Sequence, residues 1–381
     1  MDDPFAPHLC GADTWAGKYL RRFWHPVELS RNLKPGRAKP IRVLGEDFTL
    51  YRGTSGVAHV VDYACAHRCT KLSVGTIEGD HIRCMYHGWM YDADGQCIEQ
   101  PSEPEPFAQK IRIRSVPAQE YLGLIFCWFG AGTPPPLPHY PALEQGGLLD
   151  NSSYKRQCNY YQNLDNHGDS AHVTYTHRLS LQKSMTGRGL NHKMPYVSAE
   201  ETPYGIASTA SWVDGRTRTI HLLMPNMNYF NVPSEIPGET GWTDHLAWRV
   251  PIDDETHFSC TIEQHHISEE SRRRYDEEKR RNLEAIARLE IGTRRMLDMI
   301  LAGEASLDDC AQRPDIVSLE DGVAQEGQGR SVDRSKEHLG RSDNTLIFRR
   351  KVHLRELRAL AEGRPLKEWT VPETQLVTTG V

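Results

Sequence analysis

Short apolar segments separated by polar turns fill the first third of the chain. Apolar and β-branched residues gather in runs at 41–44, 48–52, 59–62 and 122–128. Runs of this length, bounded by turn residues such as Asp92-Ala-Asp-Gly95, predict β-strands rather than helices. We therefore expect a small all-β domain over 41–135. It is preceded by an N-terminal segment, 1–40, that packs on the second domain.

The pattern changes after the proline-rich stretch 134–138, a stiff linker where we place the domain boundary. Three later segments predict strands: 219–224, 245–250 and 258–262. The strongly charged segment 268–302 predicts a solvated surface helix, and 343–363 predicts another. The second domain, 136–381, is thus expected to be α+β, with an antiparallel sheet flanked by helices.

Composition describes an ordinary globular chain and excludes several partners. The 381 residues carry a net charge of −6, with 38% hydrophobic and 25% charged residues. A net negative charge argues against nucleic acid as a partner, and no apolar run is long enough to span a membrane. No basic segment with an apolar run opens the chain, so no signal peptide is expected. Nine cysteines fit a reducing compartment, and the cytoplasm is the expected location.

Two short motifs hold two cysteines and two histidines. Cys65-Ala-His67 is followed, after sixteen residues, by Cys84-Met-Tyr-His87. Each loop offers one thiolate and one imidazole, as in a Rieske [2Fe–2S] cluster, where two Cys hold one iron and two His the other. A structural zinc site is the alternative, but zinc modules usually pair like ligands on each loop. The motifs therefore predict a Rieske cluster, which stores an electron that must be used elsewhere.

A second set of metal-binding residue types follows in Asp169-Ser-Ala-His172 and His177. Two imidazoles and one carboxylate form the facial triad of non-haem Fe(II) oxygenases, which leaves positions open for O2 and substrate. The two histidines are five residues apart, which is about 140° of rotation on a regular helix. Since they cannot both face one ion from such a helix, we expect a break or a π-bulge between them.

Together the motifs resemble the α subunits of Rieske non-haem iron ring-hydroxylating oxygenases. The phthalate dioxygenase-like and aromatic O-demethylase group is the most similar. The resemblance runs from Trp24-His-Pro-Val through the cluster loops and 169–177 to a looser C-terminal pattern at 329–343. It implies a catalytic domain of the helix-grip type that holds a mononuclear Fe(II). The family often has Gly at the position of Cys69, which we interpret as a buried free thiol.

The resemblance also implies roles for single residues. The iron would be held by His172, His177 and a distant carboxylate, for which we choose Asp321, with Glu320 and Glu326 as rivals. His167 is expected to support the site rather than bind the metal. Asp169 matches the family carboxylate that links His87 of one subunit to His172 of its neighbour, fixing both imidazoles and offering an electron path. Such a bridge crosses a subunit boundary and implies a homotrimer. The alternative is that Asp169 only caps a helix.

No G-x-G-x-x-G motif follows a strand, so the chain is expected to depend on a separate NAD(P)H-driven reductase, alone or with a ferredoxin. The predicted function is a terminal oxygenase that uses O2 to hydroxylate or O-demethylate an aromatic acid in aromatic compound degradation. A cis-dihydroxylating dioxygenase, a Rieske electron carrier without oxygenase activity and a zinc-stabilised binding protein are the alternatives. An anionic ring requires a fixed cation, and the candidates for this role are Arg249 and Arg218, with Arg178 and Arg216 also near the site.

Overall fold

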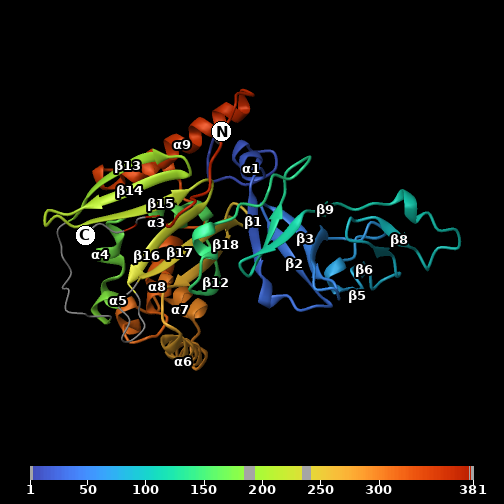
Figure 1. The fold of residues 1–381 in the computed structure, drawn as a ribbon, viewed down its shortest axis with the longest axis horizontal. Helices are drawn as coiled ribbons and strands as arrows, with labels where there is room; N and C mark the ends of the chain where they lie inside the picture. Colours follow the sequence, from blue (N-terminus) through green and yellow to red (C-terminus); the bar gives the residue numbers. More distant parts are fainter. Residues whose placement is uncertain (1–2, 184–193, 234–241, 377, 379–381) are drawn as a thin grey trace.

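The computed structural model describes residues 3–183, 194–233, 242–376 and 378. The first domain consists of three small antiparallel sheets, which lie at one end of the molecule (Figure 1). Their strands, in sheet order, are β1 (Trp24–Leu29), β11 (Leu124–Trp128) and β10 (Ala118–Tyr121); β2 (Arg37–Val43), β3 (Glu46–Arg52), β4 (Ala58–Asp62) and β9 (Ser115–Val116); and β5 (Thr76–Glu78), β6 (His81–Arg83), β7 (Met90–Tyr91) and β8 (Cys97–Glu99). The predicted all-β character of this part is confirmed.

One seven-stranded antiparallel sheet forms the centre of the second domain. Its strands, in sheet order, are β12 (Leu148–Arg156), β18 (His257–His265), β17 (Trp242–Pro251), β16 (Met227–Pro233), β15 (Thr217–Leu223), β14 (Gly205–Ser211) and β13 (Tyr196–Thr202). The three strands predicted from apolar runs correspond to β15, β17 and β18. The expected α+β fold with an antiparallel sheet is therefore confirmed.

Helices cover this sheet (Figure 1). They are α1 (Trp15–Leu20), α2 (Pro141–Glu144), α3 (Tyr160–Gly168), α4 (His172–Thr176), α5 (Arg178–Lys183), α6 (Glu269–Ala287), α7 (Thr293–Leu301), α8 (Ile316–Glu326) and α9 (Asn344–Ala361). The prediction of one helix over 268–302 is wrong in one respect, because the chain forms α6 and α7 separately. Residues 288–292 are not helical and separate the two helices, and Gly292 has an extended backbone just before α7.

The N-terminal segment contributes to both domains. Strand β1 pairs with β11 in the first domain, whereas α1 packs against α9 in the second. Trp369 Nε1 donates to the hydroxyl of Tyr19, which ties α1 to the C-terminal region at 2.9 Å. A shared apolar core, including Phe126 and Trp248, joins the first domain to the large sheet. Burial of this core fixes the two domains against each other. The cluster loops lie at one end of the molecule and the helical layer at the other.

Candidate metal centres

The two predicted cluster loops have the same backbone turn. In the first loop the Cys69 amide donates to Cys65 O at 2.9 Å; in the second the Gly88 amide donates to Cys84 O at 3.1 Å. Each turn ends in a left-handed residue, with φ of +57° at Cys69 and +75° at Gly88. This explains why glycine suits the position of Cys69. The interpretation of Cys69 as a buried thiol is wrong, because the turn leaves it exposed.

The four side chains of these loops fit a Rieske cluster. The rings of His67 and His87 lie 4.5 Å apart, and the Nδ1 atom of each is buried without a hydrogen-bond partner among the described residues. Cys65 and Cys84 are both buried free thiols. Two orphaned ring nitrogens beside two thiols are the donor set that the cluster requires. The hydroxyl of Tyr91, 3.2 Å from Cys65 Sγ, is placed to donate to a bound thiolate.

The predicted break between His172 and His177 is present. Helix α3 ends at Gly168, Asp169 is extended, and α4 begins at His172. Helix α4 ends at Thr176, so His177 lies outside it with φ −89° and ψ 27°. The prediction of a break is confirmed, and this break lets the two imidazoles turn toward each other.

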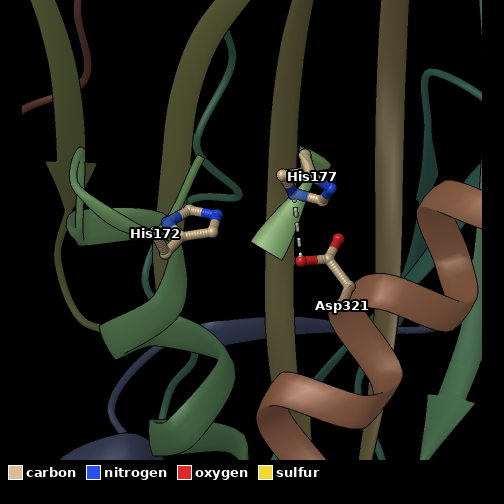
Figure 2. Close-up of side chains that lie close together, drawn as sticks. All are labelled: His172, His177 and Asp321. Carbon is tan, nitrogen blue, oxygen red and sulfur yellow. Dashed lines mark ion pairs between the residues drawn. The ribbon is translucent and has the colours of Figure 1, made fainter. Parts of the chain in front are cut away.

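His172, His177 and Asp321 converge in the second domain (Figure 2). One ligand atom from each lies within 4.8 Å of the others, and His177 Nε2 is 3.5 Å from Asp321 Oδ1. His172 Nδ1 hydrogen bonds to the carbonyl oxygen of Asp169, which can only accept. His172 therefore carries its proton on Nδ1 and keeps the Nε2 lone pair for a ligand. The structure thus brings together the three residues chosen from sequence.

The rival carboxylates on α8 have other partners. Glu320 is 1% exposed, and its oxygens accept from the Leu179 amide at 2.9 Å and from Ser180 Oγ at 2.6 Å. It also accepts from His177 Nδ1 at 3.2 Å, so it orients the imidazole from behind. Glu326 pairs with Arg294 at 2.7 Å. Asp321 is the carboxylate that lies close to ring nitrogens of both His172 and His177, and Asn166 Nδ2 donates to its Oδ1 at 3.0 Å.

The electrostatics of this site favour a cation. Burial lowers the pKa of His177, but hydrogen bonds to Asp321 and Glu320 outweigh it and raise the pKa to about 9. Burial raises the pKa of Asp321, but the hydrogen bond from His177 and nearby positive groups hold it well below its usual range. The site therefore holds a proton that a metal ion can replace. Two imidazoles and one carboxylate suit ferrous iron with open positions.

His167 and Arg249 form a buried pair next to this site. Arg249 Nη2 lies 2.9 Å from His167 Nε2, and Arg249 Nε donates to Asn163 Oδ1 at 2.8 Å. A guanidinium only donates, so His167 Nε2 accepts and is not free to bind a metal. Burial and the Arg249 charge hold the pKa of His167 well below its usual value. The predicted supporting role of His167 agrees with this geometry.

The two candidate substrate arginines differ in their surroundings. Arg249 is 2% exposed, and its hydrogen bonds go to Asn163, His167 and Trp248, so its position does not support the predicted contact with substrate. Arg218 on β15 donates to Asn231 O at 3.2 Å. Burial lowers the pKa of Arg218. Among the described residues, no carboxylate lies within ion-pairing distance of it.

Asp169 joins α3 to α4. Its Oδ1 accepts from the Ala171 amide at 2.7 Å, which is a local cap. Burial, followed by the charge of Asp343, raises the pKa of Asp169. Figure 1 shows α4 and the strands that carry the cluster loops at opposite ends of the folded molecule. Within one chain, therefore, Asp169 and His87 do not meet.

Sequence reasoning did not assign two of the residues that support the triad, Glu320 and Asn166. Glu320 was considered only as a rival ligand, and Asn166 was not considered. Both residues are adjacent to predicted site residues, but only the packing of α8 against α3 and α5 shows which group faces which. Gly322 permits the packing of α8 against α7 on its other side, because a Cβ there would lie 2.6 Å from Leu297 Cδ2.

Comparisons with known proteins agree with the fold and the cluster. Residues 23–120 match the family model of the Rieske [2Fe-2S] domain. The 5,5'-dehydrodivanillate O-demethylase oxygenase subunit of Sphingobium sp. is 29% identical over 380 residues, covering 94% of this chain and 80% of that protein. The phenoxybenzoate dioxygenase subunit alpha of Ectopseudomonas oleovorans is 33% identical over 270 residues, covering 64% and 63%.

Solved structures of similar fold include two terminal enzymes. The terminal oxygenase of carbazole 1,9a-dioxygenase from Nocardioides aromaticivorans IC177 has a TM-score of 0.66, with 18% identity and coverage of 93% of this chain and 96% of that one. NdmA of Pseudomonas putida CBB5 with caffeine has a TM-score of 0.65, with 20% identity and coverage of 90% and 93%. In the described part of the chain, no helix combines the length and apolar character needed to cross a membrane. The chain therefore contains a Rieske [2Fe-2S] domain, and over nearly its whole length it is similar to an oxygenase subunit of this kind.

Proposed function

We propose that the protein is the oxygenase component that hydroxylates or O-demethylates an aromatic acid, with electrons from a separate NAD(P)H-dependent reductase, directly or through a ferredoxin. The observation that carries the proposal is the convergence of His172, His177 and Asp321, each held by a group outside the triad. The Asp169 carbonyl holds His172, Glu320 holds His177 and Asn166 holds Asp321. Such outer partners are typical of working metal sites.

The chain supplies binding and orientation at both centres. Cys65, His67, Cys84 and His87 would hold the cluster, and His172, His177 and Asp321 would hold Fe(II). Bound in these sites, the two groups would supply stored electrons and the oxidation of substrate by O2. The protein fixes which imidazole nitrogen is free, and Glu320, which orients His177, is buried away from water.

The distance between the two centres within one chain supports a ring of subunits. The cluster loops and α4 lie at opposite ends of the folded subunit (Figure 1). The cluster that supplies electrons to the triad would therefore belong to a neighbouring copy. Exposed Met85 and Tyr86 directly precede His87 on the cluster loop and form an apolar surface for such a contact. We propose a homotrimer in which Asp169 receives His87 of the adjacent subunit. The cytoplasm remains the proposed location, on cysteine content.

Arg218 supports an aromatic acid as substrate. Several relatives are named for aromatic acids, among them phenoxybenzoate, 3-chlorobenzoate and phthalate. Arg218 is a partly buried cation without a carboxylate partner among the described residues. A substrate carboxylate would neutralise it through charge-assisted hydrogen bonds. If the target carbon belongs to a methoxy group, hydroxylation gives a hemiacetal that collapses to a phenol and formaldehyde.

The test is a screen of benzoates with and without methoxy groups, using the purified, iron-loaded protein and a competent reductase. Oxygen uptake coupled to product is the expected result, and formaldehyde release identifies demethylation. A cis-diol would instead select the dioxygenase alternative. Metal analysis separates the electron carrier from the oxygenase, because the carrier binds two irons per subunit and the oxygenase three. Asp321→Asn should lose the third iron and turnover, whereas Asp298→Asn, at an exposed side chain on α7, should keep both. An active Asp321→Asn protein would refute the site.

A further inference from the structure

A stacked pair of rings lines the sheet next to the triad. Phe230 on β16 and His245 on β17 are register partners, and their rings are nearly parallel, with centroids 4.9 Å apart. Phe230 is also 5.6 Å from the ring of His167 on α3. His245 and Arg249 are four residues apart on one strand, so they share the face that contacts α3. The pair is therefore a flat wall on the side of the sheet that carries the candidate site.

Polar atoms without partners are present on this wall. His245 Nε2 is buried and has no hydrogen-bond partner among the described residues. Asn228, two residues before Phe230 on the same face, is fully buried, and both its amide oxygen and nitrogen lack partners in the same part of the chain. A buried polar atom without a partner costs about 1–3 kcal/mol. Orphaned polar atoms beside an aromatic face are typical of a site that a ligand completes.

The charges around His245 select the kind of group that it can bind. Glu263 on β18 is the register partner of His245 on the other side. Burial raises the pKa of Glu263, but the hydrogen bond with His265 outweighs it, and the net pKa lies below its usual range. The resulting carboxylate disfavours a second anion at His245. A neutral imidazole has one donor and one acceptor nitrogen, so it pairs well with a hydroxyl group.

We propose that His245 determines substrate specificity by hydrogen bonding a hydroxyl group on the substrate ring, with the ring lying near Phe230. This inference rests on the proposed function and deepens it from an aromatic acid to a hydroxylated aromatic acid. The carboxylate belongs at Arg218 and the hydroxyl at His245. Because a site built for a hydroxyl leaves buried groups unpaired when the hydroxyl is missing, it rejects the analogue without it.

Two probes test this assignment: 4-hydroxy-3-methoxybenzoate and 3-methoxybenzoate, which share the carboxylate and methoxy groups. Their dissociation constants are measured calorimetrically on the iron-loaded protein, and formaldehyde release is measured with a reductase. We expect the wild-type protein to bind the hydroxylated probe about tenfold more tightly or better, as one buried hydrogen bond predicts. His245→Phe should reduce this ratio to within about threefold, and His245→Gln should keep part of it.

The controls separate lost recognition from lost structure. Phenylalanine can keep the stack on Phe230, so His245→Phe should retain the cluster absorbance and melting temperature. His139→Phe, at an exposed histidine on the linker, should keep the wild-type ratio. A preserved preference in His245→Phe, or none in the wild-type protein, overturns the role of His245 but leaves the aromatic-acid proposal standing. Failure of the wild-type protein to bind either probe counts against both proposals.

Discussion

The matched left-handed turns of the two cluster loops lead to a prediction of opposite outcomes. In Gly88→Ala, a Cβ is added at φ +75°, where it would lie 2.7 Å from Pro101 Cγ. The left-handed conformation costs an alanine about 1–2 kcal/mol. The steric conflict with Pro101 adds about 1–3 kcal/mol to the destabilisation. The lower entropy of the unfolded alanine variant offsets about 0.4–1 kcal/mol of it. We expect a net destabilisation of about 1–5 kcal/mol.

Cys69→Gly makes the reverse change at the equivalent position. Removing the backbone strain at φ +57° should stabilise the folded protein by about 1–2 kcal/mol. The more flexible glycine raises the entropy of the unfolded chain, which should destabilise the folded protein by about 0.4–1 kcal/mol. The net effect should lie between no change and a stabilisation of about 1.5 kcal/mol.

The assay for both variants is thermal unfolding followed through the visible absorbance of the cluster, which reports on the first domain. Because His87 directly precedes Gly88, Gly88→Ala should also lower cluster content. Cys69→Ala keeps the strain and serves as the matched control. A Gly88→Ala protein as stable as the wild type, or a Cys69→Gly protein destabilised by more than 1 kcal/mol, would refute the strain argument.

The remaining predictions concern the second domain. Glu320→Gln should weaken iron binding about 10–100-fold, measured by chelator competition, because His177 loses its ionised partner; unchanged affinity would contradict that role. Asp169→Asn should keep the cluster absorbance and the iron but stop turnover, and normal turnover would remove the proposed bridge. Arg218→Met should raise the dissociation constant of a benzoate at least about tenfold, with no such change for a neutral methoxybenzene. Burial lowers the pKa of three histidines, to about 4 at His25 and about 3 at His257 and His353. Their unfolded forms bind protons below pH ~6.5, so stability should fall as pH drops, by about 2 kcal/mol per histidine at pH 5, and a flat denaturation profile from pH 7 to 5 would disprove it.

The sequence alone predicted the residue types and the ligand spacing of both candidate centres. Cys65, His67, Cys84 and His87 could be recognised because their spacing within each loop is short, and a local turn is enough to bring paired ligands together. The five-residue spacing of His172 and His177 predicted a helix break, because α-helical rotation is fixed by local geometry. The strand and helix segments were readable for the same reason, since periodicity is a local property.

Tertiary structure decided what depends on contacts between distant segments. Asp321, Glu320 and Glu326 lie on one helix and share the same chemistry, so only the packing of α8 against α3 and α5 shows which carboxylate lies close to both His172 and His177. Arg249 and Arg218 read alike in sequence, yet one is taken by His167 and the other keeps no carboxylate partner among the described residues. The stacking of Phe230 on His245 depends on strand register, which two strands set together. Such choices rest on burial and partner geometry, and neither is written in the spacing of residues along the chain.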